Sequence, residues 1–242
     1  MRPWVRQIAI AATILLAGCA DPVVLPEPVK GPLPASVRLS PQLPARDAAA
    51  NFVAAASRVE PVAEQYCRAR TRALPCDFRI VVDDRPGQPP NAFQTLDRSG
   101  RPVIGLTLTL IAGARNVDEL AFVIGHEAAH HILGHLPQQQ GSAAAGAILA
   151  GVLATLDGAD EATVRQAQDI GAVLGARRYS KEFELEADAL GTEVAYRAGF
   201  DPVRGSAFFD RLGDPGNRFL GTHPPNAARK AIVRRVAAGL RQ

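Results

Sequence analysis

The sequence predicts an α+β fold that is mostly helical, with a small β-sheet beside one central helix. Two observations lead to this expectation. Short runs rich in β-branched residues lie between residues 78 and 107, and helical spacing of apolar residues prevails over most of the chain after residue 45. No internal repeat is evident, and a chain of 242 residues can bury a full core, so residues 45–242 are expected to form one domain.

The expected elements begin with a helix over residues 46–72, which continues despite Pro61. Strands are predicted at residues 78–82, 91–95 and 103–107, with a turn at residues 98–100. The central helix follows over residues 120–136, where apolar residues recur at helical spacing, and Pro137 is expected to end it. Further helices are predicted over residues 161–174, 202–212 and 225–240, and another begins in the block at residues 180–188 and ends at residue 198.

Residues 142–156 form an apolar stretch, rich in Ala and Gly, that carries no charge. The stretch is shorter than the roughly 20 residues that a membrane-spanning helix needs. Its small residues favour close helix packing or a mobile lid over a cleft. Insertion into a membrane surface is the alternative, although an interfacial helix usually has a charged face and this stretch has none.

The first residues have the parts of a secretory signal. Arg2 and Arg6 precede an apolar run over residues 8–16, and Cys19 follows a small-residue cleavage site. Residues 1–18 therefore resemble a bacterial lipoprotein signal, which implies that Cys19 carries lipid and that Ala20 directs sorting to the outer membrane. An N-terminal anchor helix is the alternative, but the run is too short to span a bilayer. The Pro-rich residues 19–44 are expected to form an extended tether.

Removing the signal changes the charge balance and the cysteine count. The chain has 27 Lys and Arg against 24 Asp and Glu, and the signal holds two of the arginines, so 25 against 24 leaves a formal charge of +1. No cluster of basic and aromatic residues suggests a nucleic-acid partner. Cys67 and Cys76 remain in a compartment that permits disulfides, and we expect them to pair; a free buried pair is the alternative.

The run from His126 to His130 has the pattern H-E-x-x-H. Residues four apart lie on one face of a helix, so His126 and His130 can bind a single metal ion. Glu127 lies about 100° around the axis, where its carboxylate can reach a water held by that metal. The pattern predicts a zinc-hydrolase helix, whereas a buried helix with hydrogen-bonded histidines is the alternative. His131 and His135 lie about 140° and 180° from His126 and are expected to pack or to support the ligands.

Two histidines need a third protein ligand, and residues 180–188 supply candidates. A third His six residues after the second is ruled out, because position 136 is a leucine. Glu184 and Asp188 share a helical face, whereas Glu182 and Glu186 lie about 200° away. We assign Glu184 to the metal and Asp188 to a hydrogen bond with a ligating imidazole. An acidic first turn favoured by the helix dipole is the alternative for Glu184.

Four blocks of the chain resemble the HtpX-like and CAAX-prenyl-protease zinc metallopeptidases, especially their small soluble periplasmic branch. The resemblance covers about residues 47–236. The blocks are residues 91–93 with the strand through 107, residues 125–135, residues 180–188 with Gly191, and residues 222–225 followed by Arg229. The resemblance implies a zincin-type domain in which His126, His130 and Glu184 bind one Zn²⁺ and Glu127 is the general base. Lys181 departs from the family, which usually has Arg there.

The resemblance also assigns roles to two further regions. It places Asn91, Ala92 and Phe93 along the cleft, where an edge strand can bind an extended peptide through main-chain hydrogen bonds. An ordinary core strand is the alternative. It places His223 near the zinc, either stabilising an oxyanion or occupying the open coordination position. A structural loop histidine is equally compatible with the residues.

The expected function is that of a zinc-dependent endopeptidase, lipid-anchored through Cys19 to the outer membrane and facing the periplasm. Its expected partners are unfolded or misfolded envelope polypeptides, with no nucleic acid. A chaperone-like outer-membrane assembly factor with little proteolysis is the first alternative. A zinc-dependent cell-wall amidase is a second alternative, which fits the block at residues 184–188 less well.

Overall fold

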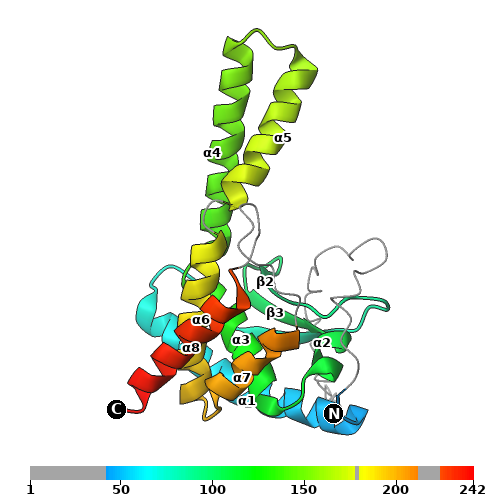
Figure 1. Cartoon of the computed structure of the whole chain (residues 1–242), viewed down its shortest axis with the longest axis vertical. Coiled ribbons are helices and arrows are strands. Elements are labelled where there is room, and N and C mark those ends of the chain that lie inside the picture. The colour runs from blue at the N-terminus through cyan, green and yellow to red at the C-terminus, as the bar shows by residue number, and fades with distance from the viewer. Residues whose placement is uncertain (1–41, 178–179, 212–223) are drawn as a thin grey trace, which may run out of the picture.

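The protein has the predicted mostly helical α+β fold, as a computed structural model shows (Figure 1). The structure describes residues 42–177, 180–211 and 224–242. The expected signal, Cys19, most of the tether and His223 lie outside these residues. In chain order the elements are α1 Ala45–Arg70, β1 Arg79–Asp83, β2 Ala92–Leu96, β3 Pro102–Thr107, α2 Leu108–Gly113, α3 Val117–Ile132, α4 His135–Leu156, α5 Glu161–Arg177, α6 Ser180–Arg197, α7 Pro202–Gly205, the 3₁₀ helix η2 Ser206–Arg211, and α8 Asn226–Leu240.

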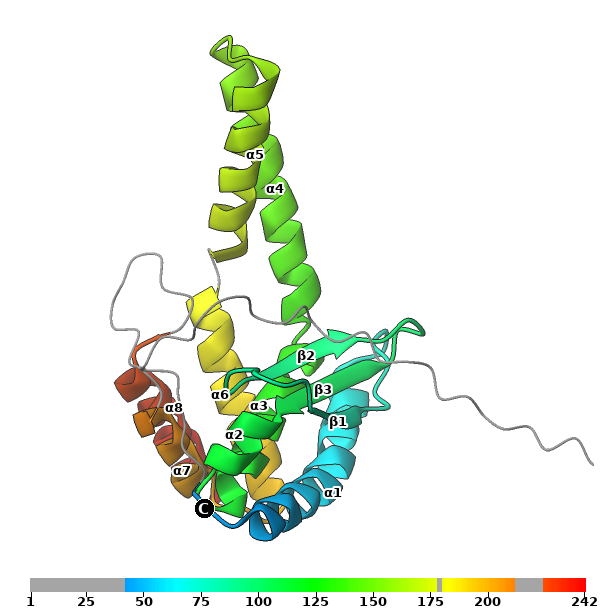
Figure 2. The same cartoon turned by 90° about the vertical axis from the view of Figure 1, so that its right-hand side faces the viewer.

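The three predicted strands are confirmed and form one sheet in the order β1-β3-β2. β1 pairs with β3 in parallel, and β2 pairs with β3 antiparallel. Every residue of β3 is buried, because this strand lies in the centre of the sheet. β2 is an edge strand of this sheet and lies alongside α3 (Figure 2).

The central helix α3 is almost completely buried between α1, α6 and the sheet. Its first turn is capped by the Asn116 side chain, which accepts hydrogen bonds from the backbone N–H groups of Asp118 and Glu119. Both acids are themselves buried. Glu119 accepts a hydrogen bond of 2.8 Å from Arg211, and Asp118 pairs with Arg204. The first turn of α3 is therefore fixed by capping and by paired charges, which a buried carboxylate requires.

A pair of glycines brings α3 and α6 into backbone contact beside His126. A Cβ atom at Gly191 of α6 would lie 2.8 Å from the backbone nitrogen of His126, and one at Gly125 would lie 2.9 Å from the Gly191 carbonyl oxygen. Only glycine at both positions permits this approach. The contact sets how far the first turns of α6 stand from the histidines of α3.

The predicted end of the central helix at Pro137 is wrong. α3 ends at Ile132, and Gly134 follows in the left-handed region with φ of 68°. Glycine adopts this conformation without the cost that a Cβ would impose, so the chain changes direction here. α4 then begins at His135, and Pro137 occupies its first turn, where its missing N–H is not needed.

α4 and α5 form a long antiparallel hairpin that projects from the body of the molecule (Figures 1 and 2). Residues 142–156 lie in α4 and pack mainly against α5, so the expected close helix packing is confirmed. The alternative of a lid over the cleft is wrong for this structure. No helix among the described residues is long and apolar enough to cross a membrane.

Other boundaries differ locally from the expected ones. The predicted helix over residues 202–212 consists of α7 followed by the 3₁₀ helix η2, and α2 had no predicted counterpart. α6 starts at Ser180, in the block where a helix was expected to begin. Cys67 and Cys76 form a disulfide with a Cα–Cα distance of 5.6 Å, which joins the end of α1 to the segment before β1.

Candidate metal site

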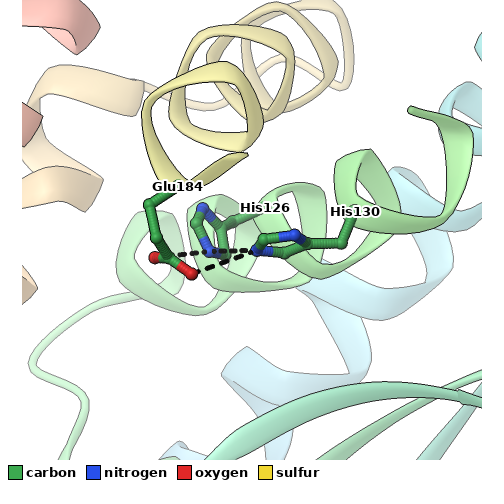
Figure 3. A group of neighbouring side chains, drawn as sticks. All are labelled: His126, His130 and Glu184. Carbon is green, nitrogen blue, oxygen red and sulfur yellow. Dashed lines mark hydrogen bonds and ion pairs between the residues drawn. The ribbon is translucent and has the colours of Figure 1, made fainter. Parts of the chain in front are cut away.

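The structure brings His126, His130 and Glu184 together at the contact between α3 and α6 (Figure 3). The two histidines lie one turn apart on α3, and Glu184 reaches them from the first turns of α6. Their candidate ligand atoms all lie within 4.8 Å of one another. Local helix geometry places the two imidazoles together, whereas the glycine contact between the helices places the carboxylate.

The three side chains fit a zinc ion by both chemistry and spacing. Two imidazole nitrogens and one carboxylate oxygen are a common ligand set of catalytic zinc. With bonds of about 2.0–2.1 Å, neighbouring ligands of a tetrahedral zinc lie about 3.3 Å apart. The two Nε2 atoms are 3.1 Å apart, and the Glu184 oxygens lie 3.5 Å from His130 Nε2 and 3.6 Å from His126 Nε2. The spacing therefore suits one small tetrahedral cation.

His126 is oriented by a buried carboxylate on α6. Its Nδ1 lies 2.9 Å from Oδ1 of Asp188, which leaves Nε2 directed toward the other candidate ligands. Burial alone would raise the pKa of Asp188, but hydrogen bonds from Arg229 and His126 hold that pKa below its ordinary value. Asp188 is therefore a carboxylate that accepts the Nδ1 proton of His126, which presents the Nε2 lone pair.

His130 is oriented by a second histidine, and the tautomers of the pair follow from the hydrogen bonds. Burial is the main cause that lowers the pKa of His135 to about 4, so His135 is neutral at pH 7. Its Nε2 lies 3.1 Å from the Glu186 carboxylate and must donate there. Its Nδ1 is then an acceptor for Nδ1 of His130, 2.9 Å away. His130 thus carries its proton on Nδ1 and presents Nε2 to the site.

This contact corrects the expected position of His135. The expected angle of 180° about the helix axis between His126 and His135 assumed one continuous helix. The chain instead changes direction at Gly134, and His135 lies beside His130. His131 packs away from the site: its Nε2 donates to the Pro75 carbonyl oxygen at 2.7 Å, and its ring meets Phe78 edge-on.

Arg229 is the main charged group at the site that the sequence did not locate. It lies in α8, is almost completely buried, and binds Asp188 through two hydrogen bonds of 2.7 Å. The same guanidinium lies 3.2 Å from Oε2 of Glu184 and stacks over the Phe209 ring at 3.9 Å. Arg229 therefore links the two acids of α6 to α8. Its presence in a resembling block singled it out, but no local pattern indicates this long-range contact.

A pocket of about 360 Å³ opens beside the candidate ligands. Half-buried Glu127 lines this pocket together with His126, His130 and Glu184. Part of the lining is apolar and was not predicted; this apolar wall consists of Leu110, Phe122, Val123, Phe208 and Phe209. A pocket of this size holds one side chain or a short peptide segment.

The expected substrate-binding strand divides between two environments. Asn91 and Ala92 line the pocket, at the start of β2. Phe93 does not: Asn91 precedes β2, and within the strand the Phe93 side chain points to the face opposite that of Ala92. Its ring covers Gly105 on β3, where a Cβ would lie 2.1 Å from the ring. The structure thus places Phe93 in sheet packing and leaves Asn91 and Ala92 beside the site.

Comparison with known proteins identifies a family and a relative of the chain. The model of peptidase family M48 matches residues 54–237. A protein of Vibrio cholerae serotype O1 named beta-barrel assembly-enhancing protease is 35% identical over 129 residues. That match covers 50% of this chain and 26% of the relative, so the chain spans about a quarter of the length of the protein it matches.

Proposed function

Because the chain belongs to peptidase family M48, a family of zinc metallopeptidases, we propose that it is a zinc-dependent endopeptidase acting on unfolded or misassembled envelope polypeptides. The observation that carries this proposal is the convergence of His126, His130 and Glu184 beside a pocket that also contains Glu127. Zinc held there supplies Lewis-acid chemistry, since it lowers the pKa of water and polarises a carbonyl.

In this mechanism the chain's own residues position the reactants and move one proton. Glu127 takes a proton from the attacking water and passes it to the amine that leaves. Asp188 and His135 hold the two imidazoles in the tautomer that presents Nε2. Arg229 keeps Asp188 ionised and fixes the position of Glu184.

We further propose that the substrate binds as an extended strand along β2. Asn91 and Ala92 lie at the pocket, and β2 is the edge strand next to it. Main-chain hydrogen bonds to an edge strand do not depend on side-chain identity, which suits a protease of unfolded segments. The apolar wall that includes Phe208 and Phe209 would receive an apolar substrate side chain next to the scissile bond.

His223 belongs to the same proposal. It lies outside the described residues, six positions before Arg229, whose side chain is part of the site. We propose that His223 either stabilises the oxyanion or occupies the open zinc position. The His223→Ala variant tests both roles, because unchanged zinc coordination together with unchanged proteolysis would remove them.

For location and substrates, we propose a lipid anchor at Cys19 in the outer membrane and, as substrates, outer-membrane proteins that fail to assemble. The name of the Vibrio cholerae relative, which joins a protease to β-barrel assembly, supports this substrate class. The lipoprotein-like signal of residues 1–18 supports the anchor.

The Glu127→Gln variant tests the proposed chemistry. We expect one equivalent of zinc to remain, because Glu127 is not among the three ligands, and the cleavage of a denatured protein to fall by about 10²–10⁴-fold. Glu182→Gln is the matched control, since Glu182 is an exposed glutamate of α6 outside the site. Cleavage by Glu127→Gln at the wild-type rate would contradict the base assignment.

A second candidate function is chaperone-like binding of unfolded outer-membrane proteins with little proteolysis, and the words "assembly-enhancing" in the relative's name favour it. The two functions share the strand-binding site but differ in their need for Glu127. In a deletion strain, rescue of envelope defects by Glu127→Gln would support binding as the main role. Failure of that variant to rescue would support proteolysis.

A further inference from the structure

The projecting hairpin of α4 and α5 exposes an unusual amount of apolar surface. Eight of the twelve large apolar side chains that are exposed among the described residues lie on it, so the exposure is a property of this hairpin and not of the surface in general. The most exposed are Leu156 at 79% and Ile148 at 66%. The full set is Ile148, Leu149, Val152, Leu153 and Leu156 on α4, and Ile170, Val173 and Leu174 on α5.

The contact between the two helices is made by the smallest residues. A Cβ at Gly146 would lie 2.2 Å from the Gly171 carbonyl oxygen, and a Cβ at Gly175 would lie 2.1 Å from the Ser142 carbonyl oxygen. The backbones therefore touch at these positions, and farther along the hairpin the Gln168 side chain of α5 packs over Gly151. A hairpin in water normally buries its large apolar residues between the helices, whereas helices in lipid place small residues at the contact and large ones outside. This hairpin has the second arrangement.

The polar groups of the hairpin are also distributed as a lipid-facing surface requires. α4 contains no Asp, Glu, Lys or Arg, and its exposed apolar residues follow one another at spacings of one, three and four along one face. The Thr155 hydroxyl donates to the Gly151 carbonyl oxygen at 2.8 Å, so this hydroxyl is satisfied within its own helix. The charges of the hairpin lie on α5 and, as Asp157 and Asp160, in the turn between the two helices.

On α5, charged residues occupy a separate line. Glu161, Arg165 and Asp169 follow at four-residue spacing, and Arg165 pairs with Glu161. Ile170 and Leu174 form another line, about 100° around the helix from the charged one. The hairpin as a unit thus has the charged side that residues 142–156 lack by themselves, which removes the objection to a position at a membrane interface.

We propose that the outward face of α4, together with Ile170 and Leu174 of α5, rests in the headgroup and acyl boundary of one leaflet of a phospholipid bilayer. The charged line of α5 stays in water. Three observations favour lipid as the partner of this face. They are the small-residue contact between the helices, the absence of charge on α4, and the Thr155 hydroxyl that is bonded within its own helix. An apolar face of this kind gains free energy in proportion to the area that leaves water.

The expected tether is long enough to let the hairpin contact the membrane that holds the lipid anchor. α4 has 22 residues and is about 33 Å long. Pro-rich residues 19–44, if extended, reach roughly 70–80 Å. A lipid at Cys19, which is part of the proposed function, would therefore leave the hairpin within reach of the same membrane. A contact of the hairpin with that membrane would add to the attachment and hold the site, at the base of α4, close to the bilayer.

The test measures where an indole on the hairpin lies. Trp4 is the single tryptophan of the chain, so Trp4→Phe gives a background without indole. Leu153→Trp is added on the apolar face of α4, and Arg165→Trp on the charged line of α5 is the matched control. The full-length protein is purified in detergent and reconstituted into phosphatidylethanolamine–phosphatidylglycerol vesicles with or without brominated acyl chains.

We expect brominated lipid to reduce the fluorescence of Leu153→Trp by about twofold or more, with a blue-shifted emission, and to leave that of Arg165→Trp nearly unchanged. Absence of quenching in Leu153→Trp would overturn the proposal. A blue shift without quenching, reversed by dilution, would show that a second copy of the chain covers the face instead. Equal quenching of both variants would exclude the proposed orientation. None of these readouts depends on proteolysis, so they are independent of the test of Glu127.

Discussion

At the scale of single residues, the candidate site contains two histidines whose tautomers are determined by hydrogen bonds to their Nδ1 atoms. His126 is fixed by Asp188, and His130 is fixed by neutral His135. Each supporting group holds the Nδ1 proton, so each imidazole offers Nε2. Metal affinity should therefore depend on residues that never contact the metal.

His135→Ala tests this dependence directly. Without the acceptor for its Nδ1 proton, His130 loses the tautomer and orientation that present Nε2, and we expect zinc affinity to fall by about 10–100-fold. Competition with a chromophoric chelator measures the affinity. His131→Ala is the control, because this neighbour binds the Pro75 carbonyl oxygen away from the site. Equal zinc affinities of His135→Ala and the wild type would show that His135 does not orient His130.

Asp188 links the site to stability through its pKa. Its pKa is below the ordinary value in the folded protein, so its contribution to stability is present above the unfolded pKa of about 4 and is lost as pH falls through the folded one. Asp188→Asn removes the carboxylate to which buried Arg229 donates two hydrogen bonds and leaves only Glu184 beside that guanidinium. At pH 7 we expect the metal-free variant to lose about 3–5 kcal/mol in the free energy of unfolding.

Urea denaturation of both metal-free proteins between pH 3 and 7 checks this expectation. The difference between wild type and Asp188→Asn should be constant near neutral pH and should shrink below about pH 4. A difference that grows as the pH falls would contradict the direction of the pKa shift.

At the scale of secondary-structure elements, the site depends on how closely α3 and α6 pack. Gly191 has no room for a Cβ, which would lie 2.8 Å from the His126 nitrogen. Gly191→Ala must therefore separate the helices, moving Glu184 away from the two imidazoles. We expect a loss of about 1–3 kcal/mol in the free energy of unfolding, together with weaker zinc binding.

Gly239→Ala is the matched control for that variant. Gly239 also lies in a helix, but a Cβ there meets no atom within 4 Å. Alanine at an open helical position should raise stability by up to about 1 kcal/mol and leave zinc binding unchanged. If Gly191→Ala behaved in the same way as Gly239→Ala in thermal unfolding and zinc titration, the close helix contact would not control the site.

At the scale of the whole molecule, the sequence predicted what local periodicity determines and missed what depends on distant contacts. The spacing of His126 and His130 and the alternation of the strands require only a few neighbouring residues. The change of direction at Gly134 was missed because Pro137 is the stronger local signal for a helix end, whereas here it starts the next helix. The contact of Arg229 with Asp188 joins residues 41 apart, and no periodic pattern in the sequence indicates it.

The outward projection of the α4–α5 hairpin was missed for the same kind of reason. An uncharged stretch rich in Ala and Gly is compatible with a packed helix, a lid or an interfacial segment. The arrangement becomes evident only when Gly146 and Gly171 are seen to bring the two backbones together. Which side of a helix packs depends on its partner helix, and the periodicity of one helix does not contain that information.

The last prediction concerns stability of the whole domain when the metal is removed. The candidate ligands come from α3 and α6, 58 residues apart between His126 and Glu184, so a bound ion would join two elements that carry much of the core. A ligand that binds only the folded state stabilises it by RT ln(1 + [L]/Kd), which is about 2.7 kcal/mol at a free concentration of 100 Kd. Adding chelator should therefore lower the melting temperature of the wild type by several degrees.

Two variants make this measurement specific. Glu127→Gln keeps all three candidate ligands and should lose the same number of degrees on chelation as the wild type. His130→Ala lacks one ligand, so its melting temperature should be lower at the start and insensitive to chelator. Differential scanning calorimetry with and without added zinc gives all three values. A chelator effect on His130→Ala as large as that on the wild type would mean that the stabilising ion is held elsewhere in the chain.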